Sequence, residues 1–377
     1  MNRTKKTVCI VFGGASSEYE VSLRSATSVL LNINRDRYDV LMLGITREGQ
    51  WLLYDGPVEL IEKDKWQQTP CVRPAVLSPD RRHHGIIRLA GKRKGYRSSQ
   101  IRQRLITGDE APFEELTILP VDVVFPVLHG KNGEDGTIQG LLELAGIPYV
   151  GSNVLGSAAC MDKEVTHVML ENAGVRKTKL LAFRKNQIAD IRLLETKLSS
   201  ELGYPMFVKP ANAGSSVGVT KVKSADQLEA ALKLAFAHDD KIVVEQAVSG
   251  QEIECAVMGN EEPVASAVVG EIAPTHEFYD YEGKYLDDST DLYIPAHISD
   301  ELAQKVRAIA VKAYYAMGCA GLARVDFFVR GDGEVILNEI NTIPGFTSIS
   351  MYAKLFAASG VSYSELITKL IGYALER

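Results

Sequence analysis

The chain has 377 residues, of which 46% are hydrophobic and 24% are charged, and its formal net charge is −6. This composition is typical of a globular protein with sizeable cores, divided into two or three domains. The negative charge argues against a general affinity for nucleic acid, and no apolar run approaches the roughly 18 residues that a membrane span needs.

The cysteines and the N-terminus indicate a reduced, cytoplasmic protein. The five cysteines are odd in number and widely spaced, and they include no C-x-x-C pair. A zinc site or a disulfide framework is therefore not expected. The first residues, MNRTKKTVCIVFGG, pass from a few basic residues straight into an apolar run and lack the pattern of a signal peptide.

The first 155 residues are predicted to form a parallel α/β domain. Strand-like apolar runs alternate with helical patterns, and the strands are TVCIVFGG (7–14), YDVLMLGI (38–45) and VDVVFPVLHG (121–130). Strand, turn, helix and strand in this order are typical of a parallel sheet with helices on its faces. Ligands of such sheets collect at the carboxyl ends of the strands.

Glu18 and His129 follow two of these strand ends. A helix start after Gly-Gly favours anions, so a carboxylate at Glu18 either stabilises the helix dipole or is presented to a cationic ligand such as an ammonium group. His129 is either a hydrogen-bonded histidine at a strand end or a catalytic one. The residues alone leave both pairs of alternatives open.

One segment departs from the negative charge of the chain. Residues 81–106 carry nine Lys or Arg, two His and no acidic residue. A solvated surface excursion explains this composition without a function, and a binding patch for an anionic partner is the alternative.

Residues 156–243 are predicted to form a central domain. An amphipathic helix over 157–173 contains Lys163, and the loop KPANAGSSVGV (209–219) follows an apolar strand. The loop is not a P-loop, because its lysine precedes the glycines. Glycines and hydroxyl groups let backbone N–H groups approach an anion. The loop therefore indicates a phosphate site at Lys209, with a tight turn as the alternative.

Residues 244–377 are predicted to form a C-terminal domain. The strands KIVVEQAV (241–248) and EIECAVMG (252–259) are expected to form a hairpin. Residues 274–295 have no clear period and are rich in Tyr and Asp. A structureless stretch of this length is usually functional or disordered. It is either an omega-type lid loop or a plain surface loop.

The strongest chemical signal is GLARVDFFVRGDGEVILNEINTIPG, residues 321–345. Two apolar strands flank Asp332-Gly333, a dipeptide that favours a two-residue hairpin turn. With that turn Asp326 stands opposite Glu339, and Arg324 opposite Asn341. Facing carboxylates repel unless a cation lies between them, and an all-oxygen donor set favours Mg²⁺ completed by phosphate oxygens. A solvated face on which Arg324 neutralises the acids is the alternative.

These stretches together resemble the D-alanine–D-alanine ligase family of the ATP-grasp superfamily, nearly from end to end. The stretches that carry the resemblance are GGASSEYEVS (13–22), HGKNGEDGTIQG (129–140), GIPYVGS (146–152), MDK (161–163), FVKPANAGSSVGV (207–219), VEQAVSGQE (244–252), FYDYEGKY (278–285), GLARVDFF (321–328) and NEINTIPGFTSIS (338–350). The resemblance implies an ATP-grasp fold of mixed α/β and α+β class, preceded by a parallel-sheet domain. Its central domain would act as a lid.

The resemblance also implies an ADP-forming ligation of two D-alanines through an acyl phosphate, for peptidoglycan precursor synthesis. It assigns phosphate, adenine and ribose contacts of ATP to Lys163, Lys209, Ser215, Ser216, Glu245, Gln246, Val248 and Glu252. Two Mg²⁺ ions, which Mn²⁺ can replace, are assigned to Asp326, Glu339 and Asn341.

The remaining implied roles concern the amino-acid substrates. Glu18 would bind the ammonium group of the first substrate, and Arg324 with the amide of Gly345 would form the oxyanion site. The other substrate contacts fall on His129, Lys284, Ser350 and Met351, and a network of Glu18, Ser215 and Tyr285 would tie the central loop to the lid. A homodimer is expected from the family.

The chain departs from the family pattern beside the second-substrate site. Ile349 stands where many members have His, and Ala353 where many have Pro. Gln246 stands where a lysine is frequent. Related resistance ligases join D-alanine to D-serine or D-lactate. The intact Lys284-Tyr285 pair resembles the D-alanine type rather than the D-lactate enzymes, so a D-serine acceptor is the nearest alternative.

Overall fold

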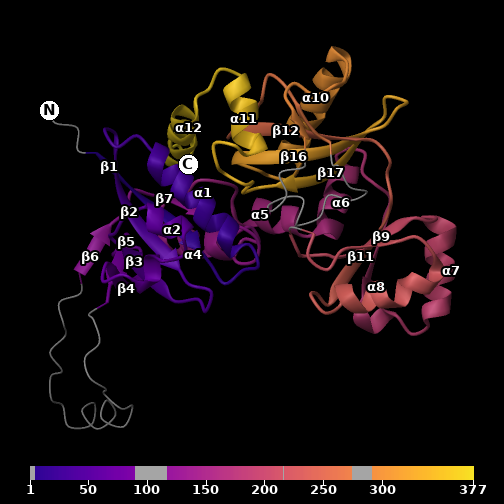
Figure 1. Ribbon diagram of the computed structural model, residues 1–377, viewed down its shortest axis with the longest axis horizontal. Coiled ribbons are helices and arrows are strands. Elements are labelled where there is room, and N and C mark those ends of the chain that lie inside the picture. Colours follow the sequence, from indigo (N-terminus) through magenta and orange to yellow (C-terminus); the bar gives the residue numbers. More distant parts are fainter. Residues whose placement is uncertain (1–4, 90–116, 215, 274–290) are drawn as a thin grey trace, which may run out of the picture.

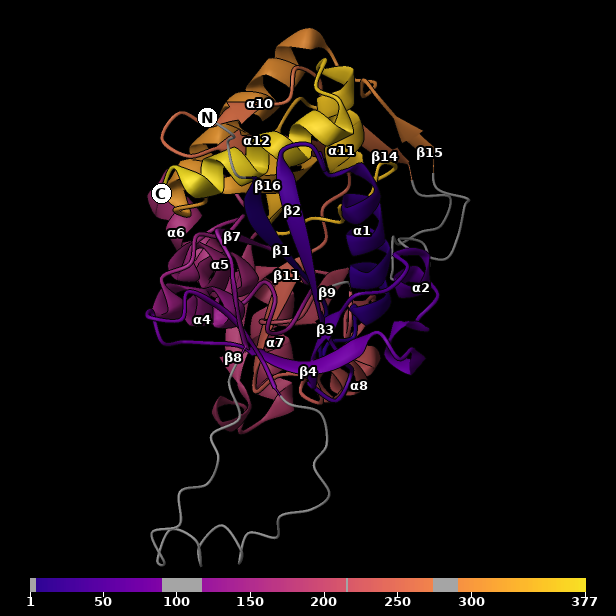
Figure 2. The same ribbon diagram turned by 90° about the vertical axis from the view of Figure 1, so that its left-hand side faces the viewer.

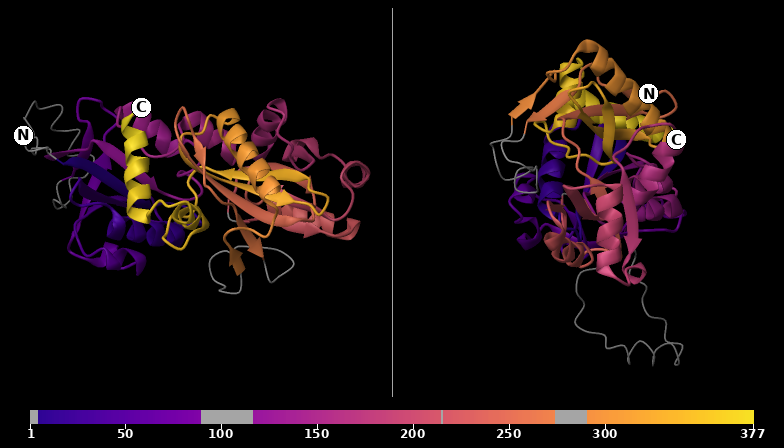
Figure 3. Two further views of the ribbon diagram at one scale, coloured as in Figure 1. Left: turned by 90° about the horizontal axis from the view of Figure 1, so that it is seen from above. Right: turned by 90° about the vertical axis from the view of Figure 1, so that its right-hand side faces the viewer.

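The computed structural model describes residues 5–89, 117–214, 216–273 and 291–377. Three sheets organise these residues (Figure 1). Seen from above, the N-terminal sheet and the central sheet lie at opposite ends of the molecule, and the C-terminal sheet lies between them (Figure 3). The mixed α/β and α+β class predicted from the sequence is confirmed.

The N-terminal sheet is mixed, with the strand order β6-β5-β4-β3-β2-β1-β7. Its strands are β1 (Lys6–Gly13), β2 (Tyr38–Ile45), β3 (Trp51–Tyr54), β4 (Val72–Leu77), β5 (Gly85–Arg88), β6 (Thr117–Pro120) and β7 (Val123–Val127). β1 pairs in parallel with β2 and β7, as predicted. From β3 to β6 the sheet continues with antiparallel pairs.

Helices cover both faces of this sheet. They are α1 (Tyr19–Asn32), α2 (Glu59–Glu62) and α4 (Thr137–Ala145), with a 3-10 turn at Trp66–Gln68. Alternate residues of β1 face opposite sides. Ile10 and Phe12 pack with α1, whereas Cys9 and Val11 pack with α4. Figure 2 shows α1 and α4 on either side of the sheet.

The central sheet is antiparallel, with the order β10-β9-β11-β8. Its strands are β8 (Leu180–Arg184), β9 (Met206–Pro210), β10 (Thr220–Val222) and β11 (Lys241–Gln246). The helices α7 (Ile191–Glu201) and α8 (Leu228–Ala235) share one hydrophobic core with it, and two further 3-10 turns lie at Lys185–Gln187 and Ala225–Gln227.

The C-terminal sheet has the order β15-β14-β12-β16-β17, and β13 also pairs with β12. Its strands are β12 (Gln251–Gly259), β13 (Val264–Ala265), β14 (Gly270–Ala273), β15 (Asp291–Tyr293), β16 (Gly321–Val329) and β17 (Val335–Asn341). The accompanying helices are α5 (Val154–Met161), α6 (Lys163–Asn172), α10 (Asp300–Ala316), α11 (Met351–Ala358) and α12 (Tyr363–Leu375). In the described residues, no helix is both long and apolar enough to span a membrane.

Two expected elements differ from the structure. The helix expected over 157–173 is divided into α5 and α6 at Asp162, whose carboxylate accepts hydrogen bonds from Glu164 N and Val165 N and so starts a new helix. The hairpin expected from 241–248 and 252–259 does not form. β11 pairs with β8 and β9, whereas β12 pairs with β14 and β16. Alternating apolar residues identify a strand but not its partner, and residues 247–250 in fact connect two sheets.

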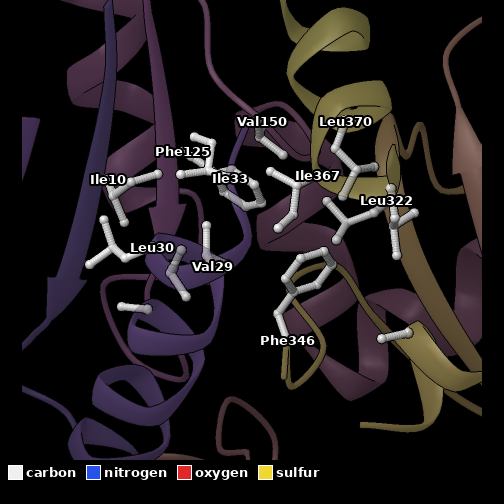
Figure 4. Close-up of a cluster of buried hydrophobic side chains, with 14 of the residues drawn as sticks. Ile10, Val29, Leu30, Ile33, Phe125, Val150, Leu322, Phe346, Ile367 and Leu370 are labelled. Carbon is white, nitrogen blue, oxygen red and sulfur yellow. The ribbon is translucent and has the colours of Figure 1, made fainter. Parts of the chain in front are cut away.

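A shared core joins the N-terminal and C-terminal parts of the molecule. Side chains from β1, β7 and α1 meet residues of α12 and of the loop after β17 (Figure 4). Phe346, at 1% exposure, is central to this contact, with its ring centroid 5.7 Å from that of Phe125 and 5.9 Å from that of Tyr352. The core therefore fixes the loop that follows β17 against the N-terminal sheet.

A methyl group at Gly44 tests the packing of the N-terminal domain. It would lie 2.3 Å from Trp66 Cη2 and 2.9 Å from Phe12 Cζ, both in side chains that are fully buried. Because overpacking a core costs about 1–3 kcal/mol, Gly44→Ala should lower the free energy of unfolding by that amount. Urea unfolding followed by tryptophan fluorescence measures it, since Trp51 and Trp66 are the two tryptophans of the chain.

The matched control is Gly140→Ala in α4, where an added methyl group meets no atom within 4 Å. Alanine is the better helix former by up to about 1 kcal/mol, so this variant should unfold at an equal or higher urea concentration. Equal stability of Gly44→Ala and the wild type would contradict the packing described for Trp66.

Candidate active site

A pocket lies where the central sheet meets β17, the edge strand of the C-terminal sheet. We call it the central pocket. It is lined by Glu134, Cys160, Met161, Lys163, Thr166, Lys177, Lys209, Ala213, Gly214, Glu245, Asn338, Glu339, Ile340, Asn341 and Thr342. Five of the predicted site residues are among them: Lys163, Lys209, Glu245, Glu339 and Asn341. The pocket thus contains both predicted phosphate lysines and two of the three predicted metal residues, whereas Asp326 is not among its lining residues.

Lys163 and Lys209 approach the pocket from different elements. Lys163 is the first residue of α6, and its ammonium group donates to Ala213 O at 2.7 Å. Lys209 lies on β9, and its Nζ is 2.6 Å from Glu245 Oε2 on the neighbouring strand β11. Both ammonium groups are therefore held by oxygens of the central sheet and of the loop 209–219 predicted to bind phosphate, which we call the central loop.

Glu245 is a buried carboxylate surrounded by cations. Burial alone would raise its pKa, but the charges of Lys209, Lys177 and Lys163 lower the pKa below its usual range. The group therefore stays ionised near neutral pH. It partly balances the positive charge that these three lysines bring to the pocket.

Lys177 is a pocket residue that the sequence did not reveal. It lies in the segment between α6 and β8, and its Nζ donates to Asn338 O on β17 at 2.5 Å. Burial lowers the pKa of Lys177 to about 8, while the charge of Glu245 opposes that shift. In the sequence it is one lysine among several in VRKTKLL, and nothing there distinguishes it from a surface lysine.

The predicted pairing of the metal residues is present. Asp326 stands opposite Glu339 and Arg324 opposite Asn341 in the β16–β17 pair. The structure adds Glu254 of β12, which stands opposite Asp326 on its other side. Three carboxylates thus form a row across three strands. Glu254 was not predicted from the sequence. The feature that could have revealed it is an acidic residue inside the apolar strand EIECAVMG.

The turn of this hairpin differs from the prediction. Arg330 N donates to Glu334 O, so three residues rather than two form the loop. Near the turn Phe327 pairs with Leu337, and the register then shifts by one residue between Asp326 and Phe327. Asn338 is the extra residue of this β-bulge. The longer turn and the bulge compensate each other, which is why Asp326 and Glu339 still face.

Arg324 neutralises part of the carboxylate row. Its guanidinium donates to both oxygens of Asp326 at 2.7 Å, and its Nε lies 3.1 Å from Glu254 Oε2. Burial opposes the charged form, but the charges of Asp326 and Glu254 raise the pKa of Arg324 well above its usual value. Asn341 Nδ2 also donates to Asp326, at 2.9 Å. The face therefore carries a fixed positive charge beside an excess of negative charge.

Glu18 is buried at 5% exposure at the start of α1, where the N-terminal domain meets the central loop. A methyl group added at Gly130 would lie 2.3 Å from Glu18 Oε2, and one added at Gly214 would lie 3.3 Å from the same atom. The central loop therefore reaches the Glu18 carboxylate. Ser215, which was predicted to complete this network, lies outside the described residues.

His129 connects the N-terminal domain to the loop after β17. Its Nδ1 is 3.0 Å from Ile343 O and its Nε2 is 3.0 Å from Ser25 Oγ. Burial disfavours the charged ring, but Glu134 and Glu18 raise the pKa of His129 above its usual value. Both ring nitrogens thus have protein partners, which fits the structural alternative for this histidine.

The predicted oxyanion and second-substrate residues lie on the loop that the shared core fixes. Phe346 N donates to Ser25 Oγ at 3.2 Å, next to Gly345. Ser350 Oγ accepts from Thr347 N at 3.0 Å, and Ser350 immediately precedes α11. Met351 is buried at 6% exposure. This loop is thus ordered by a hydrogen bond to the N-terminal domain and by one within the loop itself.

The other predicted nucleotide contacts are not among the residues that line the pocket. Gln246 ends β11, Val248 lies in the connection between the two sheets, and Glu252 lies on β12. Ser216 has a φ of +58°, which closes the turn of the central loop. Lys284 and Tyr285 lie outside the described residues, as does most of the basic segment 81–106.

The chain matches two models of one protein family. Residues 7–152 match the D-ala D-ala ligase N-terminus and residues 169–372 match the D-ala D-ala ligase C-terminus. It is 48% identical over 375 residues to a D-alanine–D-alanine ligase of Acetivibrio thermocellus. This match covers 99% of this chain and 96% of that protein. It is 47% identical to D-alanine–D-alanine ligase A of Escherichia coli K12, with the same two shares covered.

Two solved structures have the same fold. The VanG D-Ala:D-Ser ligase of Enterococcus faecalis superposes with a TM-score of 0.85 at 41% identity, covering 98% of this chain and all of that one. The D-alanine–D-alanine ligase of Coxiella burnetii has a TM-score of 0.80 at 32% identity, covering 99% and 96%. The ATP-grasp fold expected from the resemblance is confirmed, and the chain belongs to the D-alanine–D-alanine ligase family.

Proposed function

We propose that this chain joins two D-alanines to D-alanyl-D-alanine in an ATP-dependent, ADP-forming reaction that supplies a peptidoglycan precursor. The observation that carries the proposal is the central pocket. There the lysines of a phosphate site, Lys163 and Lys209, face the carboxylate-bearing edge strand β17. Full-length relatives named as D-alanine–D-alanine ligases support the choice of substrate.

The nucleotide would occupy the central pocket. Lys163 and Lys209 would exchange their present oxygen partners, Ala213 O and Glu245, for phosphate oxygens. Ser215 and Ser216 would add donors from the loop above. Adenine and ribose would lie toward the connection between β11 and β12, where the predicted contacts are Glu245, Gln246, Val248 and Glu252.

The residues at β16 and β17 fit Mg²⁺. Asp326, Glu339 and Asn341 offer only hard oxygen donors, and Arg324 leaves the carboxylate row with an excess of negative charge. Among the described residues no three His, Cys, Asp or Glu side chains form an ion site by themselves. Phosphate oxygens of the nucleotide would complete the coordination. Two Mg²⁺ ions, replaceable by Mn²⁺, would neutralise phosphate charge there.

The chemistry then has two steps. The carboxylate of the first D-alanine attacks the γ-phosphorus of ATP, so that an acyl phosphate forms and ADP leaves. The amine of the second D-alanine attacks the acyl carbon, loses a proton, and phosphate leaves from the tetrahedral intermediate. Arg324 and the amide of Gly345 would stabilise the oxyanion, since fixed donors in a dry site lower the energy of developing charge.

Other residues would hold the substrates. Glu18 would bind the first ammonium group, and His129 would keep the adjoining loop in place. Ser350 and Met351 would meet the second carboxylate. Lys284 and Tyr285 belong to the lid stretch at about 274–295, which would exclude water from the acyl phosphate.

The domain limits and the assembly complete the proposal. We assign residues 1–155, 156–243 and 244–377 to the N-terminal, lid and C-terminal domains. Two features cross these limits: α5 and α6 pack with the C-terminal sheet, and β11 extends from the lid sheet to Gln246. A cytoplasmic homodimer is proposed on the family resemblance. No membrane or nucleic-acid partner is proposed.

Glu339→Gln tests the metal assignment. The substitution keeps the shape of the side chain but removes the charge that would bind Mg²⁺. Loss of a residue behind a metal ligand already costs roughly 10–100-fold, so loss of the ligand should lower kcat by about 100-fold or more. ADP release measures it, and a Mg²⁺ titration should shift to higher concentration. Asp332→Asn, in the exposed turn of the same hairpin, is the control and should behave as wild type.

The acceptor is tested with a panel of D-alanine, D-serine and D-lactate as second substrates, assayed by ADP release. D-Alanine should give the highest kcat/KM. A D-serine acceptor is the alternative, because the chain is similar to the VanG D-Ala:D-Ser ligase. Ile349, beside the proposed second-substrate site, also departs from the family pattern. Higher kcat/KM with D-serine would replace the proposed product by D-alanyl-D-serine.

A further inference from the structure

Lys177 lies at the junction between the C-terminal and central sheets. The backbone of Lys177 forms an isolated parallel β-bridge with Leu337 of β17, and Leu337 N donates to Arg176 O at 3.0 Å. Three residues later the chain enters β8 of the central sheet, where Leu180 pairs with Glu245. The Lys177 backbone is therefore anchored to the edge strand that carries Glu339 and Asn341.

The β-bulge at Asn338 supplies a partner for the Lys177 side chain. The bulge leaves Asn338 outside the β16–β17 ladder, and bulges of this kind occur next to active sites. The Asn338 carbonyl accepts the Lys177 ammonium group at 2.5 Å. That hydrogen bond uses one of the three donors of an ammonium group. In the described part of the chain, two donors remain for the pocket that Lys177 lines.

Lys177 also interacts electrostatically with Glu245 in the pocket. Glu245 now holds Lys209 at 2.6 Å, and it is also the main negative charge acting on Lys177. When phosphate draws Lys209 away, Lys177 is, with Lys163, one of the two other lysines whose charges act on Glu245. A single carbonyl compensates this partly buried ammonium group poorly, and burial lowers its pKa to about 8. An anion in the pocket would offset that desolvation cost.

We propose that Lys177 is a third phosphate-binding cation of this pocket, acting with Lys163 and Lys209 on the phosphates that ATP and ADP share. The proposal rests on the proposed function, because it requires ATP in the central pocket. Its alternative is that Lys177 only pins the segment before β8 to the bulge. The two differ in one property: a pin needs a hydrogen-bond donor, whereas a phosphate site needs the positive charge.

The experiment measures dissociation constants of MgATP, MgADP and adenosine by calorimetry on the full-length chain. The variants are Lys177→Met, which removes donor and charge, and Lys177→Gln, which keeps a donor for Asn338 O without the charge. Hydrogen bonds to charged groups are among the strong ones. We expect both variants to bind MgATP and MgADP about tenfold or more weakly, at nearly unchanged affinity for adenosine.

Lys179→Met is the matched control, because its exposed ammonium group donates to Glu201 O, away from the pocket. It should leave all three constants unchanged. In steady-state assays KM for ATP should rise in the two Lys177 variants, while KM for D-alanine stays the same. Melting temperatures separate a loss of phosphate affinity from a loss of folding.

The results that overturn the inference are specific. Wild-type affinity for MgATP in Lys177→Gln would show a pin, and equal losses for adenosine and MgATP would show a disturbed pocket rather than a lost phosphate contact. If Lys177→Met does not fold, the Gln variant still decides between charge and donor. A wild-type chain that binds neither MgATP nor MgADP would instead overturn the proposed function itself.

Discussion

Glu254, Asp326 and Glu339 stand side by side on β12, β16 and β17, with one arginine, Arg324, bonded to the first two. Like charges across neighbouring strands destabilise a sheet. Arg324 neutralises part of this row, and the proposed Mg²⁺ ions would neutralise the rest. A register slip of one residue would turn Asp326 away from Glu339 and place apolar neighbours on the site face. The sheet that forms the core of the C-terminal domain and the site that binds charge therefore depend on the same strand pairing.

The bulge at Asn338 restores the strand register that the three-residue turn shifts, so that Asp326 and Glu339 still face each other. A three-residue loop at Gly331–Gly333 shifts the register by one, and the extra residue on β17 shifts it back before Glu339. The bulge has a second consequence, because it frees a backbone carbonyl at the edge of the sheet. Lys177, which lies 161 residues earlier in the chain, donates a hydrogen bond to that carbonyl. One irregularity thus aligns the carboxylates and brings a cation to the pocket.

The sequence predicted those parts of the site whose determinants are local. The facing of Asp326 and Glu339 follows from strand alternation, although the turn from which it was derived is wrong and the bulge corrects it. Partners distant in sequence were not predictable in this way. β11 and β12 alternate as two strands of a hairpin would, yet each completes a different sheet. Lys177 has no local feature that marks it, since its significance arises from Asn338 and Glu245. The split at Asp162 was readable in principle, because an Asp followed by two helical residues is a helix start.

The central sheet is joined to the rest of the chain by two short segments, 173–179 and 247–250, and the first of them contributes Lys177 to the central pocket. Lys163 begins α6, which packs with the C-terminal sheet, and Lys209 lies within the central sheet. Lys177 lies on one of the two connecting segments. A polyphosphate bound to all three would connect the two sides electrostatically, so its binding free energy depends on how the central sheet is placed. An acyl phosphate survives only where water is excluded. With the cations distributed across the junction, the nucleotide itself would hold the central sheet over the reacting atoms, and Gly214 of the central loop already lies close to Glu18.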